Sequence, residues 1–558
     1  PLAYSILRLV LQEQGRNDEA ISRYEHAIAS TPHSPAAYCM LGLALKENGR
    51  LDEAIGRYQH AIKLKPDYAE ARNFVAIALA ELGQLDEAIR QYEQAIVLLP
   101  SYAEAHNNLG NACKQHGRID EAISRYTSAI ALQPGYAGAH SNLLFTLNYL
   151  SRIPQATLLA ESQHFGAVAA RQSRAYSTWR GTAQSERCLR VGLVSGDLRA
   201  HAVCYFLEGV LAALAAKAAG RLQFIAYSTH AQTDLTSERI KACCHGWHSA
   251  IGLSDQQLAQ RIHDDEIDIL IDLSGHTAHN RLPMFAYKPA PVQVSWLGYF
   301  ATTGVAAIDY LLADPWTLPP SEEAHFSEKI WRLPQTRLCF TAPDVAVQVA
   351  PLPALINAYV TFGCFNNLTK MNDAVVALWA RVLRAVPGSR LFLKAAQLAE
   401  YSVRDDVLRR FAVHAIGTQR LILEGPDSRA AYLSAYQRVD IALDPFPFPG
   451  GTVSAEGLWM GVPVLTLAGQ SFLSRQGLGL LMNAGLEDWI AVDEDDYVAR
   501  ARRHAGDVHA LARLRAALRE QVLASPLFDA PRFASHFEAA LRGMWTQWCG
   551  AQTDEQLK

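Results

Sequence analysis

The sequence lacks the features that mark several special classes of protein. Its nine cysteines are scattered over 558 residues with no C-x-x-C pair, which argues against a disulfide framework and against a zinc site of paired cysteines. No apolar run reaches about 18 residues, the length that a membrane-spanning helix needs. The 51 basic and 55 acidic residues nearly balance, so nothing indicates the basic surface of a nucleic-acid-binding protein. We therefore expect a cytoplasmic protein with reduced thiols, and neither a membrane nor a nucleic acid as a partner.

Residues 1–150 repeat a pattern of 34 residues. In each copy an Asp-Glu-Ala triplet and a tyrosine lie between a glycine and a proline; the glycines are Gly15, Gly49, Gly83 and Gly117, and the prolines are Pro32, Pro66, Pro100 and Pro134. Four aligned copies resemble the tetratricopeptide repeat. The glycine ends the first helix of each pair, and the proline closes the second. Because one pair cannot bury its own apolar face, we expect the copies to stack into an α-solenoid with a concave groove.

Asn108 and Asn142 occupy the same position on the first helix of two successive copies. Side-chain amides there could clamp the backbone of an extended peptide from inside the groove, or both residues could simply be polar surface positions. The array therefore binds a peptide-like acceptor or serves as a rigid arm, and the repeats alone leave both open.

Beyond the repeats, residues 151–186 predict a connecting helix and a linker. Short apolar runs then alternate with helical stretches in two series, over 187–345 and over 346–558, the second ending in an amphipathic helix. Such alternation predicts parallel strands joined by crossover helices, and hence two doubly wound, Rossmann-like α/β domains. Sheets of this kind bind ligands beyond the carboxyl ends of their strands.

Three residues of the first α/β domain follow expected strands on that side. His201 follows the first strand, where an imidazole can act as a base, hydrogen-bond a sugar hydroxyl or meet a phosphate. A histidine that only caps the next helix fits the same pattern. Thr277 follows the third strand and could contact substrate, and Gly298 follows the fourth, where the missing side chain would let a ligand approach the backbone.

In the second α/β domain the stretch 440–465 predicts a strand, a glycine turn, a helix and a second strand. The first strand is the apolar run Ile441–Leu443, and Gly450 and Gly451 form the turn. We expect Thr452 to be the helix N-cap and Glu456 to lie one turn further in. Free N–H groups and the helix dipole favour an anion such as a diphosphate there, and a carboxylate at 456 could accept from two ribose hydroxyls. A plain tight turn with a solvated carboxylate is the alternative.

Other strand ends of this domain carry further candidates. Lys370 follows the first strand and is placed to meet a diphosphate as a point charge, although a surface lysine would fit as well. Asp427, Arg429 and Tyr432 follow the third strand, where a nucleobase could lie against backbone groups. No Asp-x-Asp motif ends a strand, so we expect Lys370 and helix N–H groups, rather than a metal, to neutralise phosphates. Two facing domains with diphosphate chemistry in the second form the GT-B layout of nucleotide-sugar glycosyltransferases.

The segments PAPVQVSWLGYFATTG (289–304) and 440–465 carry a long and specific resemblance to a known family. With the repeats in front of them, the chain resembles a bacterial member of the O-GlcNAc transferase family, glycosyltransferase family 41. The resemblance implies inverting transfer of N-acetylglucosamine from UDP-GlcNAc to Ser or Thr hydroxyls of proteins, with no metal or other cofactor. It also implies roles for individual residues: His201 as the histidine discussed as a base, Lys370 on the UDP leaving group, Asn367 at the phosphate or sugar, Gly450, Gly451 and Thr452 as the diphosphate cradle, and Glu456 as the ribose carboxylate.

The sequence departs from the family's animal members around the nucleotide. Those enzymes have Asp at the position of Glu456 and His at that of Gly451, and they have Lys and His where Arg429 and Tyr432 stand. The base pocket is therefore altered. A same-family enzyme using GDP-fucose, as the plant Spindly-type transferases do, or UDP-glucose stays an alternative, and so does a catalytically weak repeat scaffold.

Overall fold

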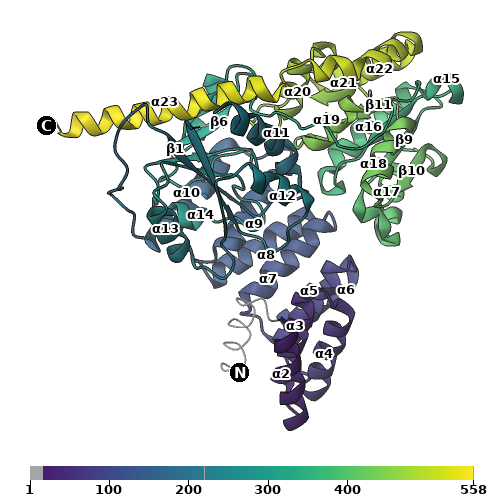
Figure 1. The fold of residues 1–558 in the computed structure, drawn as a ribbon. Coiled ribbons are helices and arrows are strands. Elements are labelled where there is room, and N and C mark those ends of the chain that lie inside the picture. The colour runs from purple at the N-terminus through teal and green to yellow at the C-terminus, as the bar shows by residue number, and fades with distance from the viewer. Residues whose placement is uncertain (1–16, 219, 557–558) are drawn as a thin grey trace. The chain divides into compact units, whose positions relative to one another are not determined.

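The computed structural model describes residues 17–218 and 220–556, so Gly15 of the repeat pattern lies outside the described residues (Figure 1). The chain divides after Thr146 into two compact units. Within the described residues, no helix is both long and apolar enough to cross a membrane.

The first unit consists of helices in antiparallel pairs. Three first helices end just before Gly49, Gly83 and Gly117, whose φ angles of 77°, 81° and 88° lie in the left-handed region that glycine adopts without strain. The predicted solenoid of tetratricopeptide repeats is therefore confirmed. Its helices are α2 (Asn17–Ser30), α3 (Pro35–Glu47), α4 (Leu51–Leu64), α5 (Ala69–Glu81), α6 (Leu85–Leu98), α7 (Ala103–Gln115), α8 (Ile119–Leu132) and α9 (Ala137–Leu147).

Close packing within a pair depends on small residues. A side chain at Gly110 would lie 2.6 Å from the ring of Tyr126, which is fully buried on the second helix of the same pair. Gly42 and Tyr58 make the same contact two pairs earlier in the array. Each of these two rings fills the space above a helix that carries no side chain there.

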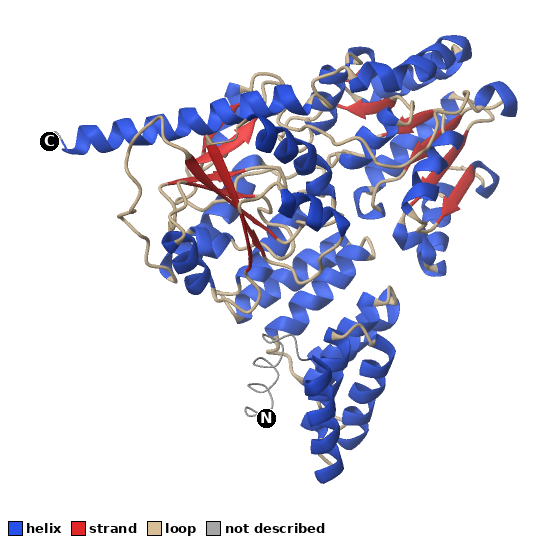
Figure 2. Cartoon of the chain, viewed as in Figure 1, coloured by secondary structure: helices blue, strands red, loops and turns tan. Residues whose placement is uncertain are grey.

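The second unit contains two separate parallel sheets, drawn in red in Figure 2. The first has the strand order β3-β2-β1-β4-β5-β6-β7, and every neighbouring pair is parallel. Its strands are β1 (Leu189–Ser195), β2 (Leu222–Ser228), β3 (Gly246–Ser249), β4 (Ile269–Asp272), β5 (Val292–Ser295), β6 (Tyr310–Ala313) and β7 (Lys329–Arg332). The sequence did not predict β3 and β7, because these four-residue edge strands are mostly half-buried and carry no apolar run.

The second sheet has the order β10-β9-β8-β11-β12-β13, again with parallel neighbours. Its strands are β8 (Thr361–Cys364), β9 (Arg390–Lys394), β10 (Leu421–Glu424), β11 (Ile441–Leu443), β12 (Val464–Leu467) and β13 (Ile490–Ala491). In both sheets the strand order reverses direction once, between β1 and β4 and between β8 and β11, and ligands of doubly wound sheets bind at such a reversal. The predicted pair of doubly wound α/β domains is confirmed.

Helices connect and cover these strands. Before and within the first sheet they are α10 (Gln155–Arg171), α11 (Ala202–Lys217), α12 (Leu235–Ala242), α13 (Asp255–Asp264), α14 (Leu282–Phe285) and the 3₁₀ helix η1 (Pro320–His325). Around the second sheet they are α15 (Ala354–Asn357), η2 (Leu368–Lys370), α16 (Asp373–Ala385), η3 (Ala396–Ala399), α17 (Tyr401–Ala412), η4 (Thr418–Arg420), α18 (Arg429–Ala435), η5 (Tyr436–Arg438), α19 (Thr452–Trp459), α20 (Gln476–Ala484), η6 (Glu487–Trp489), α21 (Glu494–Gly506) and α22 (Val508–Leu523).

The terminal helix α23 (Ala530–Gln556), yellow in Figure 1, returns to the first sheet and packs against α11 and β5. The ring of Trp296, just after β5, lies 4.7 Å from that of Phe537 on α23. Arg542 on the same helix donates to the carbonyls of Arg187 and Arg221, at 2.6 and 2.7 Å. The last helix therefore joins the core of the first α/β domain although it follows the second in sequence.

Candidate functional site

The glycine turn after β11 is held by one buried carboxylate. Asp444 is 1% exposed and accepts from the Gly450 N–H at 2.7 Å, the Ser454 hydroxyl at 3.1 Å and the Thr466 hydroxyl at 3.0 Å. Burial raises the pKa of Asp444 to about 6, against the opposing effect of these hydrogen bonds and of Lys370. Asp444 was not among the predicted site residues, although its place directly after a buried strand was a usable signal.

The expectation that Thr452 caps the following helix is wrong. Gly451 is the N-cap residue, and Thr452 is the first residue of α19. Asp444 binds both Gly450 and Ser454, so the chain is already fixed on either side of the turn and enters the helix one residue early. The backbone N–H groups of Gly451 and Thr452 open the helix with no capping side chain.

Lys370 lies against this turn. Its Nζ donates to the carbonyl of Pro449 at 3.0 Å and to Oδ1 of Asn366 at 3.1 Å, and it lies 4.3 Å from the ring centre of Phe448. Desolvation lowers the pKa of Lys370 to about 8, although the attraction of Asp444 acts in the opposite direction. A protonated lysine and the glycine turn therefore meet where β8 and β11 end, which is the reversal point of the second sheet.

Asn367 caps η2 beside this lysine. Its side-chain oxygen accepts from the Thr369 N–H at 2.9 Å and from the Gln397 amide at 2.5 Å. Because the oxygen is engaged and the residue is exposed, its amide NH₂ group is the part that can reach a ligand.

Glu456 is engaged by two neighbours. It is 1% exposed, lies 2.5 Å from the Arg429 guanidinium and accepts from the Tyr432 hydroxyl at 3.0 Å. Burial raises the pKa of Glu456, and Arg429 counteracts this rise. Arg429 and Tyr432, two of the three candidates around a nucleobase, thus meet at Glu456. The third candidate, Asp427, instead forms an ion pair with Lys394, at 3.4 Å.

The first sheet contributes His201 from the N-cap position of α11. Its Nδ1 accepts from the Val203 N–H at 3.4 Å and lies 3.4 Å from a carboxylate oxygen of Asp197. Burial lowers its pKa below the usual value, so the imidazole is mostly neutral at pH 7 although Asp197 favours the charged form. The capping role and a role as a base are both compatible with this position.

The other two candidates of the first sheet are held by their own backbone neighbourhood. The Thr277 hydroxyl donates to the Ser274 carbonyl at 2.9 Å. At Gly298 a side chain would collide with the backbone of Leu273 and Ser274. Gly298 is therefore needed within the fold, because its own chain passes close to it; the approach of a ligand at Gly298 stays a prediction.

Direct contacts connect the two sheets at these ends. Tyr205, one turn after His201 on α11, lies 4.9 Å from the guanidinium of Arg429. The ring of Phe448, which covers Lys370, lies 6.3 Å from that of Phe300, just beyond β5. Residues from both sheets thus surround the same region.

In the first unit, Asn108 and Asn142 belong to a chain of asparagine side chains. Asn108 donates to Asn73 at 3.2 Å, Asn142 donates to Asn107 at 2.9 Å, and Asn107 donates to Asn108 at 3.4 Å. Asn73 and Asn107 are buried, whereas Asn108 and Asn142 are partly exposed. The two predicted residues are thus positioned by buried partners that the sequence analysis did not identify.

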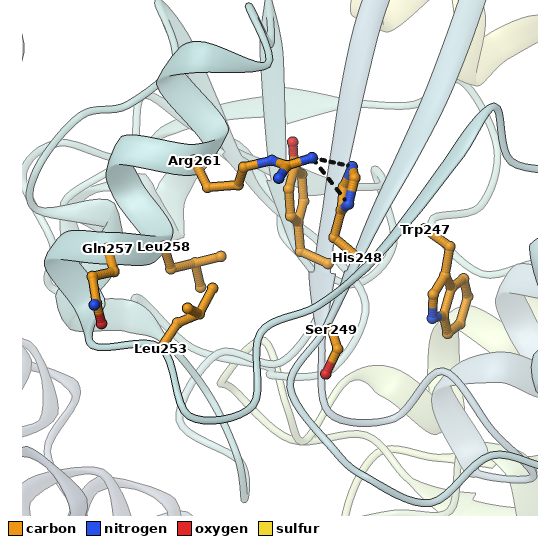
Figure 3. A pocket seen from close by; sticks show the side chains of 8 residues that line it. Trp247, His248, Ser249, Leu253, Gln257, Leu258 and Arg261 are labelled. Carbon is orange, nitrogen blue, oxygen red and sulfur yellow. Dashed lines mark hydrogen bonds between the residues drawn. The ribbon is translucent and has the colours of Figure 1, made fainter. Parts of the chain in front are cut away.

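Two further observations concern other kinds of site. A cavity of about 290 Å³ lies at the β3 edge of the first sheet, between Trp247 and Leu258, where Arg261 donates to His248 (Figure 3). It contains none of the predicted site residues. Among the described residues there is also no group of three or more His, Cys, Asp or Glu side chains that could hold a metal; metal independence remains a prediction.

Comparisons with known proteins agree with this architecture. The model of glycosyl transferase family 41 matches residues 136–346 and 343–537, and tetratricopeptide repeat models match 11–78, 76–117 and 103–136. A solved structure of a mutant Thermobaculum terrenum O-GlcNAc transferase superposes with a TM-score of 0.87 at 32% identity, covering 93% of this chain and 98% of that one.

Two groups of plant proteins are also similar. The probable UDP-N-acetylglucosamine–peptide N-acetylglucosaminyltransferase SPINDLY of Petunia hybrida is 38% identical over 415 residues, 73% of this chain and 44% of its own length. The probable enzyme of the same kind named SEC, from Arabidopsis thaliana, is 28% identical over 385 residues, 66% of this chain and 38% of its own. The chain therefore spans less than half the length of these relatives.

Proposed function

The chain belongs to glycosyl transferase family 41, and we propose that it is an inverting protein O-glycosyltransferase that moves N-acetylglucosamine from UDP-GlcNAc to Ser or Thr hydroxyls of proteins. The observation that carries this proposal is the contact of Lys370 with the glycine turn that Asp444 holds. A cation and free helix N–H groups at the reversal point of a doubly wound sheet suit the diphosphate of a nucleotide sugar.

The leaving group is the first chemical problem of such a transfer. As the bond from C1 to the diphosphate breaks, negative charge grows on the departing oxygen. Lys370 and the N–H groups of Gly451 and Thr452 stabilise that charge, and one well-placed donor of this kind contributes about 3–4 kcal/mol to the transition state. A pKa of about 8 leaves Lys370 mostly protonated at pH 7, and a bound diphosphate raises it further.

The acceptor hydroxyl must also lose its proton. A neutral imidazole can take it, and the lowered pKa of His201 keeps that form dominant at neutral pH. A base in this role contributes about 10²- to 10⁴-fold, and the donor phosphate can serve as the base in its place. Glu456 then has lone pairs left for ribose hydroxyls while it positions Arg429, and Asn108 and Asn142 offer amides to the backbone of an acceptor.

A variant of Lys370 tests the proposal. We expect Lys370→Ala to lower turnover with UDP-GlcNAc and bacterial lysate proteins by about 10²- to 10³-fold, and to lower it far more than His201→Ala does. Lys329→Ala, which removes an exposed lysine at the start of β7, is the matched control. Wild-type turnover by the Lys370 variant would refute the leaving-group role.

GDP-fucose stays the alternative donor, because Arg429 and Tyr432, which contact Glu456, make the base pocket different from that of the family's animal members. The printed names of both plant relatives, SPINDLY at 38% identity and SEC at 28%, give UDP-N-acetylglucosamine as their donor. Calorimetry with UDP against GDP, followed by turnover with each nucleotide's sugars, decides between the donors. Tighter binding of GDP would replace UDP-GlcNAc by GDP-fucose and leave the rest of the proposal in place.

A further inference from the structure

Gln476 is a buried polar side chain that the site described above does not use. It is the first residue of α20, which follows β12, the neighbour of β11 in the sheet. The residue is 2% exposed, and its Oε1 has no hydrogen-bond partner within the described part of the chain. A buried amide normally has partners for its polar atoms, because leaving one unpaired is costly. The unpaired oxygen of Gln476 is an acceptor, and it therefore calls for a hydrogen-bond donor from outside the chain.

The amide of Gln476 faces the glycine turn. A Cβ atom placed on Gly451 would lie 2.9 Å from Nε2 of Gln476, and among the described residues, apart from its two chain neighbours, no other residue lies within 4 Å of it. Any side chain at 451 would have to displace this amide. Gln476, which follows β12, thus occupies the space that a side chain on Gly451, the N-cap residue of α19, would otherwise fill.

The same carboxylate fixes both partners of this contact. A Cβ atom on Gly477, the next residue of α20, would lie 2.8 Å from Oδ2 of Asp444, whose other oxygen accepts from Gly450 at 2.7 Å. The first turn of α20 and the glycine turn are therefore packed on one buried group. A side chain carried by such rigid elements keeps its position when a ligand arrives.

We infer that the side-chain amide of Gln476 binds the donor substrate: its Nε2, which faces the glycine turn, donates to an oxygen of the nucleoside diphosphate, and its unpaired Oε1 accepts from a hydroxyl of the same ligand. This inference rests on the proposed function, because the ligand is the diphosphate placed there at Lys370 and the α19 N-terminus. An amide suits the position beside a lysine: it adds a directed donor without adding charge. A leucine would fill nearly the same volume, so packing alone gives no reason for a polar group with an unpaired oxygen.

Isothermal calorimetry on the full chain tests this inference. UDP and GDP are first titrated into the wild-type protein, and the nucleotide that binds more tightly is then used for the variants. We expect Gln476→Leu to weaken binding by about ten- to a hundredfold, the range for a hydrogen bond to a charged group. Gln476→Glu keeps the shape but brings a carboxylate to the diphosphate, so it should weaken binding more than Gln476→Leu. The control is Gln521→Leu: this glutamine donates to the Ala484 carbonyl at 2.7 Å, at the opposite end of α20, and its loss should change the Kd less than twofold.

The outcomes separate the inference from the function on which it rests. If wild-type protein binds neither nucleotide, the proposed function fails and the inference with it. If wild-type protein binds one of them and both Gln476 variants bind it equally well, only the inference fails. It also fails if Gln476→Glu binds no more weakly than Gln476→Leu, or if a lower thermal midpoint, measured by circular dichroism, accounts for the loss. Should the leucine variant not fold, the near-isosteric glutamate variant still decides.

Discussion

Replacing Asp444 with asparagine separates the charge of this residue from its shape. Asp444 raises the pKa of Lys370 by attraction, while desolvation lowers it to about 8. Lys370 acts on the leaving group in its protonated form, so activity should fall as the pH rises through this pKa. Without the negative charge at 444 the pKa falls further, and the alkaline limb of activity moves to lower pH. A loss of about 1.4 kcal/mol of attraction moves it by about one pH unit and reduces the protonated fraction at pH 8 from about one half to about one tenth.

The free energy of unfolding, by contrast, should change little when Asp444 is replaced with asparagine. The pKa of Asp444 rises from 3.8 to about 6 on folding, which corresponds to about 3 kcal/mol. A carboxyl group with a raised pKa stabilises the folded state below 3.8, and this contribution is lost as the pH rises through 6, so the ionised group is unfavourable at pH 7. Asparagine removes that cost, but it leaves one of the three hydrogen-bond donors without an acceptor, at about 1–3 kcal/mol. The two effects are of similar size and opposite sign.

The assay is kcat/KM with the preferred donor between pH 6 and 9, together with the thermal midpoint of unfolding. Asp440→Asn is the matched control, because Asp440 lies at the other end of β11 and is fully buried. It accepts from the N–H groups of Ala354 and Thr361, at 2.9 and 2.7 Å. We expect an unchanged alkaline limb for Asp440→Asn and a shifted one for Asp444→Asn. An alkaline limb of Asp444→Asn that coincides with that of the wild type would refute the coupling.

Two predictions concern other parts of the chain. Replacing Asn108 and Asn142 with alanine should raise KM for protein acceptors and leave the Kd of the nucleotide unchanged, with the exposed Asn48→Ala as control; unchanged acceptor kinetics would show that the repeats are not the acceptor site. Arg337 is 1% exposed between two phenylalanine rings, and within the described residues neither its Nε nor its Nη1 has a hydrogen-bond partner. Arg337→Met should therefore raise the free energy of unfolding by about 1–3 kcal/mol, and a lower midpoint in thermal unfolding would contradict this.

The sequence predicted best where local pattern and tertiary environment agree. Ile441–Leu443 was predicted to the residue, since it is a buried apolar run between an aspartate and a proline-rich turn. The repeat array was also predicted correctly, because each copy carries the same residue types at its helix ends. The edge strands Gly246–Ser249 and Lys329–Arg332 were missed, since pairing at the rim of a sheet leaves no apolar signature.

Within the site, the sequence identified side chains but not what holds them. Lys370 and Glu456 follow from strand ends and helix starts, which are local features. Asp444 acts on Thr466, 22 residues further along the chain, and Gln476 meets Gly451 from a distance of 25 residues. The misplaced cap at Thr452 has the same origin, since the helix start depends on where Asp444 is held. No local pattern encodes contacts between the ends of neighbouring strands.

The buried polar groups at the two ends of the second sheet differ in their hydrogen-bond partners. At the amino ends of its strands, Arg515 is 1% exposed and donates to three carbonyls, those of Ala350, Tyr436 and Val439. At the carboxyl ends, the pKa values of Lys370 and Asp444 are both displaced against their charged forms, and Gln476 keeps an unpaired oxygen. Burial nevertheless lowers the pKa of Arg515 to about 10 and raises that of Asp440 at the same end, so displaced pKa values occur at both ends. The difference lies in the partners: Arg515 has three carbonyl acceptors within the chain, whereas a diphosphate beside Lys370 would restore the charged form of the lysine that desolvation opposes.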